Sequence, residues 1–576
     1  MSVPMRVVHT IPQLVLENAK LLGDEPALVR RVSGDWETLT WSEYGAAVRR
    51  TARALIASGI EPGDRVAILS YNTPEWVIFD VAAMAIGAVP VGIYFSSSDV
   101  EIAELLERSN ARIVLAQTTA QIAAVREASI ESVELLVGID DAQGDTVSWP
   151  EFLSLGDAVD PDVVDDRIAA IEWDDPATLM FTAAGYGSPV GVILTHDNLV
   201  AASRSSVDLF NVTQSDSALS YLPLSHIAEQ IFTILAPAHV GYPVAFAQSI
   251  GRVRVDLLDI EPAIFFGVPL VWSGFERALR KQVEALTGAQ ARIANWSMGV
   301  SRDSIAARNA GSSRSPYLRA KVAVARRLFT DKARSAMGFA NVRLAFSGAV
   351  SVDPSTLEYF AGIDLPVREV YGLSESTGPA VVTREGATRF GTVGLPMPGV
   401  EISIADDGEI LIRGQSVFSG YLDDEDATGH ALRDGWLHTG DLGGIGGDGL
   451  LTISGRKKDI IITAGGKNVD AGAVEPLLRE DPLILDAVLV GDGHDQLGVL
   501  ISVAEAFDGD DDLAFAQAEA VVERVNQRFS RAEQVRRIGL LPRPLSVDLG
   551  EVSPAGEVDR LVVVEHFTDE VAELYR

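Results

Sequence analysis

The stretch FTAAGYGSPVGVILTHDNLV, residues 181–200, joins an apolar run to a helix start through a glycine-rich turn. The run from Ala177 to Phe181 predicts a buried strand, and Thr195 before HDNL predicts a helix N-terminus. Turns of this kind bind anions, because their backbone N–H groups converge on the ligand and the helix N-terminus adds positive potential. This turn contains no lysine, and only Thr182 and Ser188 carry hydroxyls. The stretch therefore indicates an anion-binding scaffold without its cation.

Strand-like and helix-like segments alternate along most of the chain. The apolar runs RVAILS (65–70), ARIVLA (111–116) and SVELLVGI (132–139) are accompanied by helix-like stretches such as Trp41 to Gly59. This alternation predicts an α/β fold of parallel and mixed sheets layered with helices. We expect further strands in PAIFFGVPLVW (262–272) and VRLAFSGAV (342–350).

From about Gly391 onward, the sequence consists of shorter segments rich in Gly and Asp. EISIADDGEILIRG (401–414) predicts antiparallel hairpins, and hence a β-rich subdomain. We predict a large domain over residues 1–456 and a small α+β domain over residues 457–576, with a hinge near Lys458. The predicted elements of the small domain are strands at Ala487–Gly491 and Val499–Val503, and helices at Asp512–Phe529 and Val562–Leu574.

Composition limits the classes of partner and the chemistry. The chain has 576 residues, enough for at least two domains. Its 81 acidic and 47 basic residues give a formal charge of −34, which argues against nucleic acid or an anionic membrane surface as a general partner. The lack of cysteine excludes disulfides and thiolate sites.

The most membrane-like segment is WVIFDVAAMAIGAVPVGIYF, residues 76–95. Asp80 and Pro90 interrupt it, so it predicts a buried helix that turns into a strand. The N-terminal segment also has no pattern of a secretory signal. We therefore expect a soluble, cytoplasmic protein without a membrane span.

Seven motifs, taken in order and spacing, resemble those of the acyl-adenylate-forming superfamily, most closely its long-chain acyl-CoA synthetases. Seven motifs in register make chance agreement implausible, and the match spans nearly the whole chain. They are LTHDNL (194–199), YLPLSHIAEQ (221–230), FSGAV (346–350), VYGLSES (370–376), GTVGLPMPG (391–399), DGWLHTGDLG (434–443) and GRKKDIIITAGGKNV (455–469).

The resemblance implies two half-reactions and a small domain that rotates about Lys458. Carboxylate and ATP first give acyl-AMP and pyrophosphate, and the thiol of CoA then attacks the acyl-AMP. The resemblance also places Gly465 and Gly466 along the path of CoA, and it implies that Glu375 coordinates magnesium during adenylation. The AMP site implied by the motifs comprises Ser347, Gly348, Ala349, Glu369, Val370, Tyr371, Gly372, Ser374, Asp441 and Arg456.

Residue chemistry agrees with several of these roles. Tyr371 offers a flat face for adenine, Asp441 an acceptor for ribose hydroxyls and Arg456 a donor fork. His226 coincides with the family's gate beside the substrate carboxylate, and we predict a catalytic role for it. Each has an ordinary alternative: a structural histidine for His226, a packed aromatic for Tyr371 and a capping carboxylate for Asp441.

Two departures from the family pattern concern ATP. The family loop reads roughly T-S-G-T-T-G-x-P-K-G, whereas residues 182–191 read T-A-A-G-Y-G-S-P-V-G, so Val190 replaces the lysine and Tyr186 adds bulk. Near the C-terminus, the family pattern E-L-T-P-T-x-K-x-K-R aligns its first lysine with Glu557 and its second with Asp559. Losing one donor aimed at developing charge typically costs about a hundred- to a thousandfold in rate. Both recognisable lysines of the ATP half-reaction are thus missing.

The pattern predicts a non-adenylating acyl-CoA ligase, which takes acyl-AMP from a separate adenylating ligase and transfers the acyl group to CoA. ATP and magnesium would then not be used productively. This combination is similar to ligases of the platensimycin and platencin type, which implies a bulky terpenoid acid and antibiotic biosynthesis. One alternative is a complete ATP-dependent long-chain acyl-CoA synthetase, with Lys467 or another cation compensating. The other is an inactive adenylate-binding scaffold protein.

Overall fold

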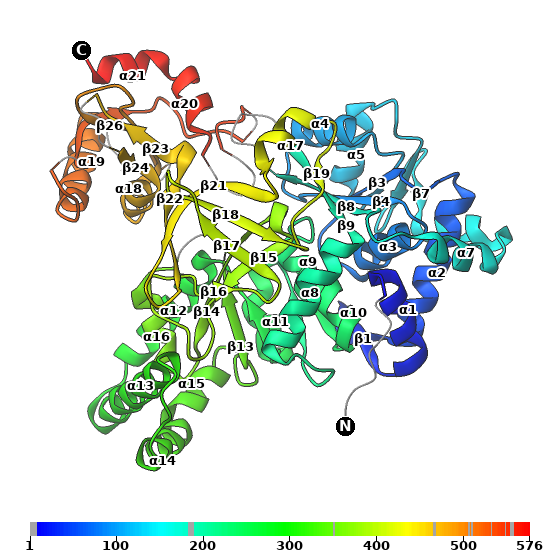
Figure 1. The fold of residues 1–576 in the computed structure, drawn as a ribbon, viewed down its shortest axis with the longest axis horizontal. Helices are drawn as coiled ribbons and strands as arrows, with labels where there is room; N and C mark the ends of the chain where they lie inside the picture. The colour runs from blue at the N-terminus through cyan, green and yellow to red at the C-terminus, as the bar shows by residue number, and fades with distance from the viewer. Residues whose placement is uncertain are drawn as a thin grey trace.

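The computed structural model describes residues 9–182, 189–348, 352–464, 468–504, 507, 511–531, 533–547, 549–552 and 558–576. Sheets and helices form a large region up to residue 456 and a small region after it, at one end of the molecule (Figure 1). The predicted α/β class is confirmed. The helices of the large region are α1 Ile11–Leu22, α2 Trp41–Ala57, α3 Pro74–Ala85, α4 Asp99–Ser109, α5 Thr119–Ala128, α6 Trp149–Leu155, α7 Pro161–Ala170, α8 His196–Phe210, α9 Ile227–Gln230, α10 Ala236–Val240, α11 Val253–Ile260, α12 Pro269–Glu284, α13 Gly288–Asn309, α14 Pro316–Ala325, α15 Asp331–Ser335, α16 Pro354–Ala361 and α17 Glu425–Ala431.

An eight-stranded sheet carries the segment quoted first above. Its order is β19-β9-β8-β4-β3-β5-β6-β7, parallel from β8 through β7 and antiparallel where β9 pairs with β8 and β19. Val66 and Ile68 pack into one core with α2 and α3, while Ala67 and Leu69 pack into another with α4 and α5. Burial on both faces explains why these strands are continuous apolar runs. The strands are β3 Arg65–Leu69, β4 Val89–Ile93, β5 Ile113–Ala116, β6 Leu135–Gly138, β7 Val147–Ser148, β8 Pro176–Thr182, β9 Val190–Thr195 and β19 Gly420–Tyr421.

A nine-stranded sheet lies beside it, in the order β16-β15-β14-β13-β12-β10-β11-β1-β2. The predicted strand at residues 262–272 is wrong beyond Phe266, because the chain turns at Gly267 and Pro269 begins α12 at a position where its missing N–H costs nothing. Helices α12 to α15 form an extended connection between β12 and β13 (Figure 1). The strands are β1 Pro26–Val32, β2 Asp35–Thr40, β10 Ala218–Ser220, β11 Val244–Phe246, β12 Ile264–Phe266, β13 Leu344–Ser347, β14 Val367–Leu373, β15 Gly378–Val382 and β16 Leu395–Pro396.

The predicted hairpins form a third, antiparallel sheet. Its strands are β17 Val400–Ile404, β18 Glu409–Gly414, β20 Leu432–Arg433, β21 Trp436–Ile445 and β22 Leu451–Arg456. The small region that follows is α+β, as predicted. Its elements are β23 Ile460–Ile462, β24 Asn468–Asp470, α18 Ala471–Leu478, β25 Ile484–Val490, β26 Leu497–Val503, α19 Asp511–Asn526, β27 Val535–Leu540, α20 Arg560–His566 and α21 Thr568–Leu574.

One predicted helix of the small region is divided. The sequence predicts a helix over Val562–Leu574, but α20 ends at His566 and α21 begins at Thr568. Phe567 leaves helical geometry (φ −110°, ψ 35°) and buries its ring in the core of the small region. Arg543 lies over that ring, 4.9 Å from its centroid. Packing of one aromatic side chain therefore sets the break.

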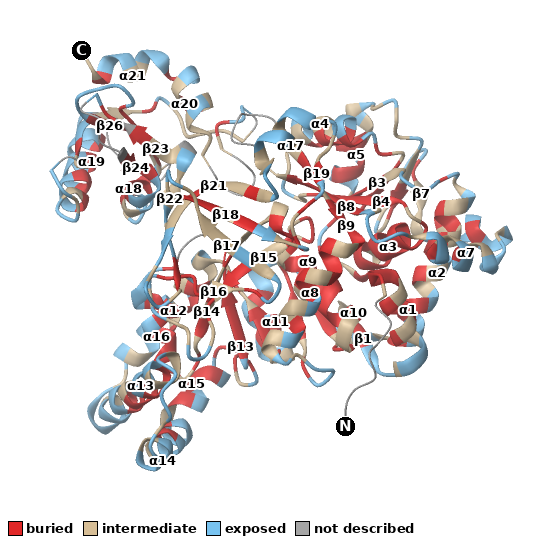
Figure 2. Cartoon of the chain, in the orientation of Figure 1, coloured by how far each residue is buried: buried red, intermediate tan, exposed pale blue. Residues whose placement is uncertain are grey.

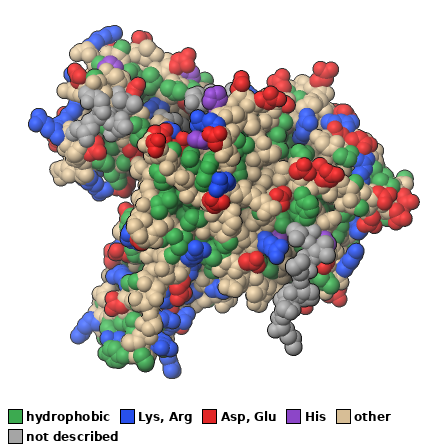
Figure 3. Space-filling view, viewed as in Figure 1, with side chains coloured by type: hydrophobic (Ala, Val, Ile, Leu, Met, Phe, Trp, Pro, Cys, Tyr) green, Lys and Arg blue, Asp and Glu red, His purple; other side chains and the backbone are tan. Residues whose placement is uncertain are grey.

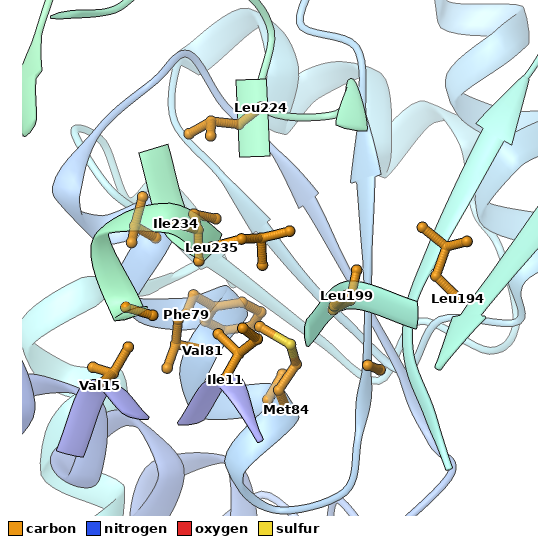
Figure 4. Close-up of a cluster of buried hydrophobic side chains, with 14 of the residues drawn as sticks. Ile11, Val15, Phe79, Val81, Met84, Leu194, Leu199, Leu224, Ile234 and Leu235 are labelled. Atoms are coloured by element: carbon orange, nitrogen blue, oxygen red, sulfur yellow. The ribbon is translucent and has the colours of Figure 1, made fainter. Parts of the chain in front are cut away.

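Buried residues concentrate along the sheets and the inner faces of the helices (Figure 2). Figure 4 shows one cluster, in which Ile11 and Val15 of α1 approach Phe79 and Met84 of α3. Helix α3 is buried nearly all round and leads into β4, which confirms the helix-turn-strand predicted for residues 76–95. Within the described ranges, no helix has the length and apolar character required to cross a membrane.

Candidate active site

The adjacent parallel strands β13 and β14 bring several predicted AMP-site residues together. Ser347 pairs with Glu369 in the register of these strands, and Gly348 follows directly. Beyond Tyr371 and Gly372, β14 leads into a short 3₁₀ turn that carries the predicted residues Ser374 and Glu375. Ligands of layered α/β proteins bind at the carboxyl ends of such strands. The fold therefore gathers these residues where a nucleotide is expected.

Tyr371, Asp441 and Arg456 form a connected group at this edge. The phenol of Tyr371 donates to Oδ2 of Asp441 at 2.8 Å, and Nε of Arg456 lies 3.3 Å from Oδ1. Asp441 and Arg456 face each other across the antiparallel pair β21–β22. Burial and the neighbouring Asp441 charge raise the pKa of Tyr371, so the phenol stays protonated and donates. Because each carboxylate oxygen has a further lone pair, Asp441 still has acceptor capacity for hydroxyl groups.

Two of the predicted positions, Gly348 and Gly372, leave little or no space for a side chain. A Cβ at Gly372 would lie 1.8 Å from the carbonyl oxygen of Gly378, because β14 and β15 approach closely at a register shift. A Cβ at Gly348 would lie 3.0 Å from the carbonyl oxygen of Val370 and 3.3 Å from the ring of Phe266. Gly372 therefore has no room for a side chain, whereas Gly348 is only tightly packed.

Burial raises the pKa of Glu369 to about 7. Glu369 is only 6% exposed and lies next to apolar residues of β13 and β14. The carboxyl group therefore changes charge near neutral pH, rather than near 4.5.

Glu375 is linked to the base of the glycine-rich turn. Its carboxylate accepts a 2.8 Å hydrogen bond from the phenol of Tyr421, and burial raises its pKa. Tyr421 lies on β19 and pairs with Val192 of β9, two residues after Val190. Val190 is half-buried and pairs with Thr182 of β8, where the turn closes. The side chain at the position of the family lysine is thus an apolar one, at the mouth of the turn.

A cavity extends from Gly348, Gly372 and Ser374 into the apolar interior. Its empty space, including the mouth, is about 920 Å³. His226, Gly348, Gly372 and Ser374 lie in its wall, and the remaining lining is mainly aliphatic and aromatic. The lining residues are Ser206, Val207, Phe210, Val212, His226, Ile227, Ala228, Ile231, Phe232, Ala236, Tyr242, Ile264, Phe266, Leu344, Phe346, Gly348, Val370, Gly372, Leu373, Ser374, Gly378, Pro379, Val382 and Met397.

His226 lies where the polar edge meets this cavity. It precedes α9, and its Nδ1 accepts the backbone N–H of Ala228 at 3.1 Å. A neutral imidazole that accepts through Nδ1 carries its proton on Nε2. Within α9, Glu229 is buried and accepts a hydrogen bond from the hydroxyl of Thr233 at 2.8 Å, and burial raises its pKa to about 7.

Two contacts of the site were missed by sequence reasoning. One is Tyr421, whose partner Glu375 lies 46 residues away. The other is Lys457, which precedes the predicted hinge residue Lys458. Nζ of Lys457 donates to Asp407 at 2.7 Å and to Glu409 at 2.8 Å. Glu409 also lies 3.0 Å from Nδ1 of His438. The only sequence signal was acidic residues in the turn of a predicted hairpin, which is a common feature of turns.

The region around Glu557 is held by residues on either side of it. Glu551 is fully buried and contacts both Arg543 and His566, while Asp559 accepts from the backbone N–H groups of Leu561 and Val562 and caps α20. Val552 and Val558 pair as an antiparallel bridge. Asp559, aligned with the family's second lysine, therefore has a structural role.

Several predicted positions lie outside the described residues, and their roles stay predictions. The backbone of Lys458 is described, in the 3₁₀ turn Lys457–Asp459, but its side chain is not. No group of three or more His, Asp or Glu side chains suited to a metal is found among the described residues. The positions outside are residues 183–188, Ala349, Gly465, Gly466, Lys467 and Glu557.

Comparison with known proteins defines the class. Residues 15–422 match the AMP-binding enzyme family, and residues 458–576 match the AMP-binding enzyme C-terminal domain. The chain therefore belongs to the AMP-binding enzyme family, which is the acyl-adenylate-forming superfamily predicted from its motifs.

The relatives narrow this class. The chain is 36% identical to the long-chain-fatty-acid–CoA ligase FadD15 of Mycobacterium bovis, over 96% of this chain and 95% of that protein. It is 32% identical to the long-chain-fatty-acid–CoA ligase ACSBG2 of Gallus gallus, over 98% and 81%. The fold is similar to that of the O-succinylbenzoate coenzyme A synthetase of Bacillus subtilis in complex with AMP, with a TM-score of 0.68 and 21% identity over 96% and 97% of the two chains. These findings support the predicted enzyme class of acyl-CoA ligase.

Proposed function

We propose that this protein is an acyl-CoA ligase that catalyses thioesterification and has lost efficient adenylation. The substrates are a preformed acyl-AMP and CoA, and the products are acyl-CoA and AMP. The single observation that carries the proposal is Val190, an apolar residue at the mouth of the glycine-rich turn, where the family pattern has a lysine. Glu557, which reverses the charge of the second family lysine, supports it.

The groups needed for thioesterification are retained. Tyr371, Asp441 and Arg456 provide a face, an acceptor and a donor for AMP, and the cavity beside them accommodates the acyl group. The thiol of CoA loses its proton, its sulfur bonds to the acyl carbon, and the bond from that carbon to the phosphate oxygen breaks, releasing AMP. None of these steps involves a pyrophosphate group.

We propose that His226 acts as a hydrogen-bond donor in this step. Because Nδ1 accepts the N–H of Ala228, the neutral ring carries a proton on Nε2. A donor in the cavity wall stabilises negative charge on the acyl oxygen, which develops as the sulfur attacks. We therefore propose that His226 polarises the acyl group, and that the thiol proton leaves to solvent.

The apolar wall of the cavity favours a substrate with an apolar body. The aromatic side chains of Phe210, Phe232, Phe266 and Phe346 provide much of its wall. Such a wall binds a long-chain or a bulky polycyclic carboxylic acid, including the predicted terpenoid class, through burial of apolar surface. A separate adenylating ligase would supply the acyl-AMP.

The second candidate is a complete ATP-dependent ligase of long-chain fatty acids. The names of FadD15 and ACSBG2 favour it, since both match over nearly the whole chain. Glu375 also fits a magnesium ion, because magnesium is commonly held by one or two carboxylates together with phosphate oxygens. In that case, magnesium would neutralise phosphate charge, and backbone N–H groups of the turn would replace the missing lysine.

One experiment separates the candidates. The purified protein is given synthetic palmitoyl-AMP or a polycyclic acyl-AMP with CoA, and separately the free acid with ATP, magnesium and CoA. The proposal predicts acyl-CoA only from the acyl-AMP. Product at similar rates from both mixtures would establish the second candidate, and no product from either would favour the inactive scaffold.

A gain-of-function variant sharpens this test. Val190→Lys combined with Glu557→Lys restores both cations and should produce pyrophosphate from acid and ATP. Val190→Met with Glu557→Gln is the matched control, because it extends the side chain at position 190 and removes the carboxylate without adding a cation. If the lysine variant gains no more activity than the control, the assignment of these two positions is wrong.

A further inference from the structure

The charge of the chain is distributed unevenly. Residues 288–335, which form α13, α14 and α15, contain ten Lys and Arg residues and two Asp residues, and no Glu. The whole chain carries a formal charge of −34, so this segment is strongly basic within an acidic protein. We call residues 288–335 the basic arm. In Figure 1 it projects from the body of the large region, on the side away from the small region.

Exposed apolar side chains occur on the same arm. On α14 and the π-helical turn that follows it, Tyr317, Val324 and Leu328 are 70%, 49% and 44% exposed. Separations of 7 and 11 residues place all three on one helix face. Trp296 and Ile293 on α13, the helix packed against this turn, are also exposed. Figure 3 shows hydrophobic side chains at the tip of the arm with Lys and Arg around them.

Basic side chains border this apolar face. Nζ of Lys321 lies 4.5 Å from the ring centroid of Tyr317. Arg292, Arg319 and Arg327 are exposed, and no carboxylate of the described residues forms an ion pair with any of them. Surface arginines without acidic partners keep their charge available for an external anion.

We propose that the basic arm docks the enzyme on an anionic lipid surface. An exposed apolar helix face with aromatic residues and a basic border is the pattern of helices that lie in the membrane interface. Anionic lipids attract such segments by roughly 1 kcal/mol for each basic residue near the surface. Because the Debye length is about 8 Å at physiological salt, the acidic body is screened from a surface that the projecting arm touches.

The arm is joined in sequence to two strands that line the acyl cavity. The arm belongs to the connection between β12 and β13, and Phe266 and Phe346 of these strands lie in the cavity wall. Acyl groups that fill an apolar cavity of this size partition into lipid. Docking would therefore place the enzyme where its substrate or product accumulates. The overall charge of the chain, taken alone, predicts no binding to an anionic surface, because residues outside the arm dominate that charge.

Vesicle co-sedimentation of the full chain tests the proposal. Binding is measured with vesicles of phosphatidylcholine alone and of phosphatidylcholine mixed with phosphatidylglycerol, at about 0.05 M and about 0.5 M salt. We expect binding to the anionic vesicles only, and loss of binding at high salt. Equal binding to both vesicle types, or no binding to either, would overturn the proposal.

Two variants locate the surface. Arg292→Gln/Arg319→Gln/Arg327→Gln should weaken vesicle binding on the order of a hundredfold, from three lost contacts. Arg479→Gln/Arg531→Gln/Arg536→Gln removes three exposed arginines of the small region, and so changes net charge equally; it should bind as the unchanged protein does. Tyr317→Ser/Leu328→Ser should also weaken binding, while thioesterification of a soluble acyl-AMP stays unchanged in all three variants.

Equal weakening by the two arginine variants would show a general charge effect and refute the role of the arm. A dimer in light scattering that the arm variants abolish, without vesicle binding, would instead assign the surface to a second copy of the chain. Both outcomes leave the proposed thioesterification activity untouched, because that activity is measured on soluble acyl-AMP.

Discussion

Replacement of Glu551 by Gln tests how the segment that carries Glu557 is anchored. Glu551 is fully buried, and its carboxylate contacts Arg543, His566 and the backbone N–H of Ser546. Burial alone would raise the pKa of this carboxyl group, but these hydrogen bonds outweigh burial and lower the pKa to about 2, from an ordinary value near 4.5. At about 1.4 kcal/mol for each pH unit, the ionised form contributes about 3 kcal/mol to the stability of this part of the fold.

The sign of the pH dependence follows from the lowered pKa. The contribution is fully present above pH 4.5, where the carboxyl group is ionised in both the folded and the unfolded chain. It is lost between pH 4.5 and about pH 2, because the unfolded chain takes up the proton in this range while the folded chain does not, and below this range both are protonated. Glu551→Gln should remove most of the contribution at neutral pH and make stability insensitive to this range.

Amide hydrogen exchange is the suitable assay, since all eight tryptophans lie before residue 437 and fluorescence does not report on the small region. We expect the protection of the Val563 and Phe567 amides in the variant to fall about a hundredfold at pH 7. Protection of the β3 amides should not change. Glu565→Gln, an exposed position on the same helix, is the matched control. A fall of less than tenfold would refute the assigned role of the Arg543–Glu551 contact.

Three further predictions concern the site. Gly372→Ala should lower the melting temperature, because overpacking against the Gly378 carbonyl costs about 1–3 kcal/mol. Gly348→Ala, whose contacts are longer, should keep the fold and reduce the affinity for acyl-AMP. Equal melting temperatures for the two variants would contradict the described difference in backbone approach. Glu369→Gln should raise the melting temperature at pH 8 and leave it unchanged at pH 4. With a pKa of about 7, the buried carboxyl group ionises as the pH rises, and its charge destabilises the fold. An equal gain in melting temperature at pH 4 and pH 8 would exclude this cause. Lys457→Met should increase proteolytic cleavage near residue 457, since Asp407 and Glu409 lose their shared cation, while Lys332→Met on the basic arm should not; unchanged cleavage would show that these ion pairs do not restrain the segment.

The layers of the fold could be predicted because their signals are local. Strands buried on both faces read as continuous apolar runs, and RVAILS and ARIVLA correspond to β3 and β5. The start of α8 was equally readable, because Thr195 caps it by accepting from the backbone N–H of Asn198. The run at 262–272 failed because apolar residues on both sides of a Gly-Val-Pro turn carry no period that separates a strand from a helix.

The site was predicted only in part. Motif resemblance predicts Tyr371, Asp441 and Glu375 as site residues, but nothing local to VYGLSES indicates the phenol of Tyr421, which lies 46 residues from Glu375. The Lys457 contacts with Asp407 and Glu409 span 50 and 48 residues. Contacts of this kind depend on how three sheets pack together, which a pattern of residue types does not contain.

The anchors around Glu557 have an evolutionary consequence. The Glu551 cluster, the Val552–Val558 bridge and the Asp559 cap all belong to residues outside 553–557. Selection for folding therefore acts on these flanking residues. Under the proposed function, a single codon change between lysine and glutamate at position 557 would alter which half-reaction the enzyme favours. Division of labour between two ligases would then be only a few mutational steps from a complete enzyme, and reversible by the same route.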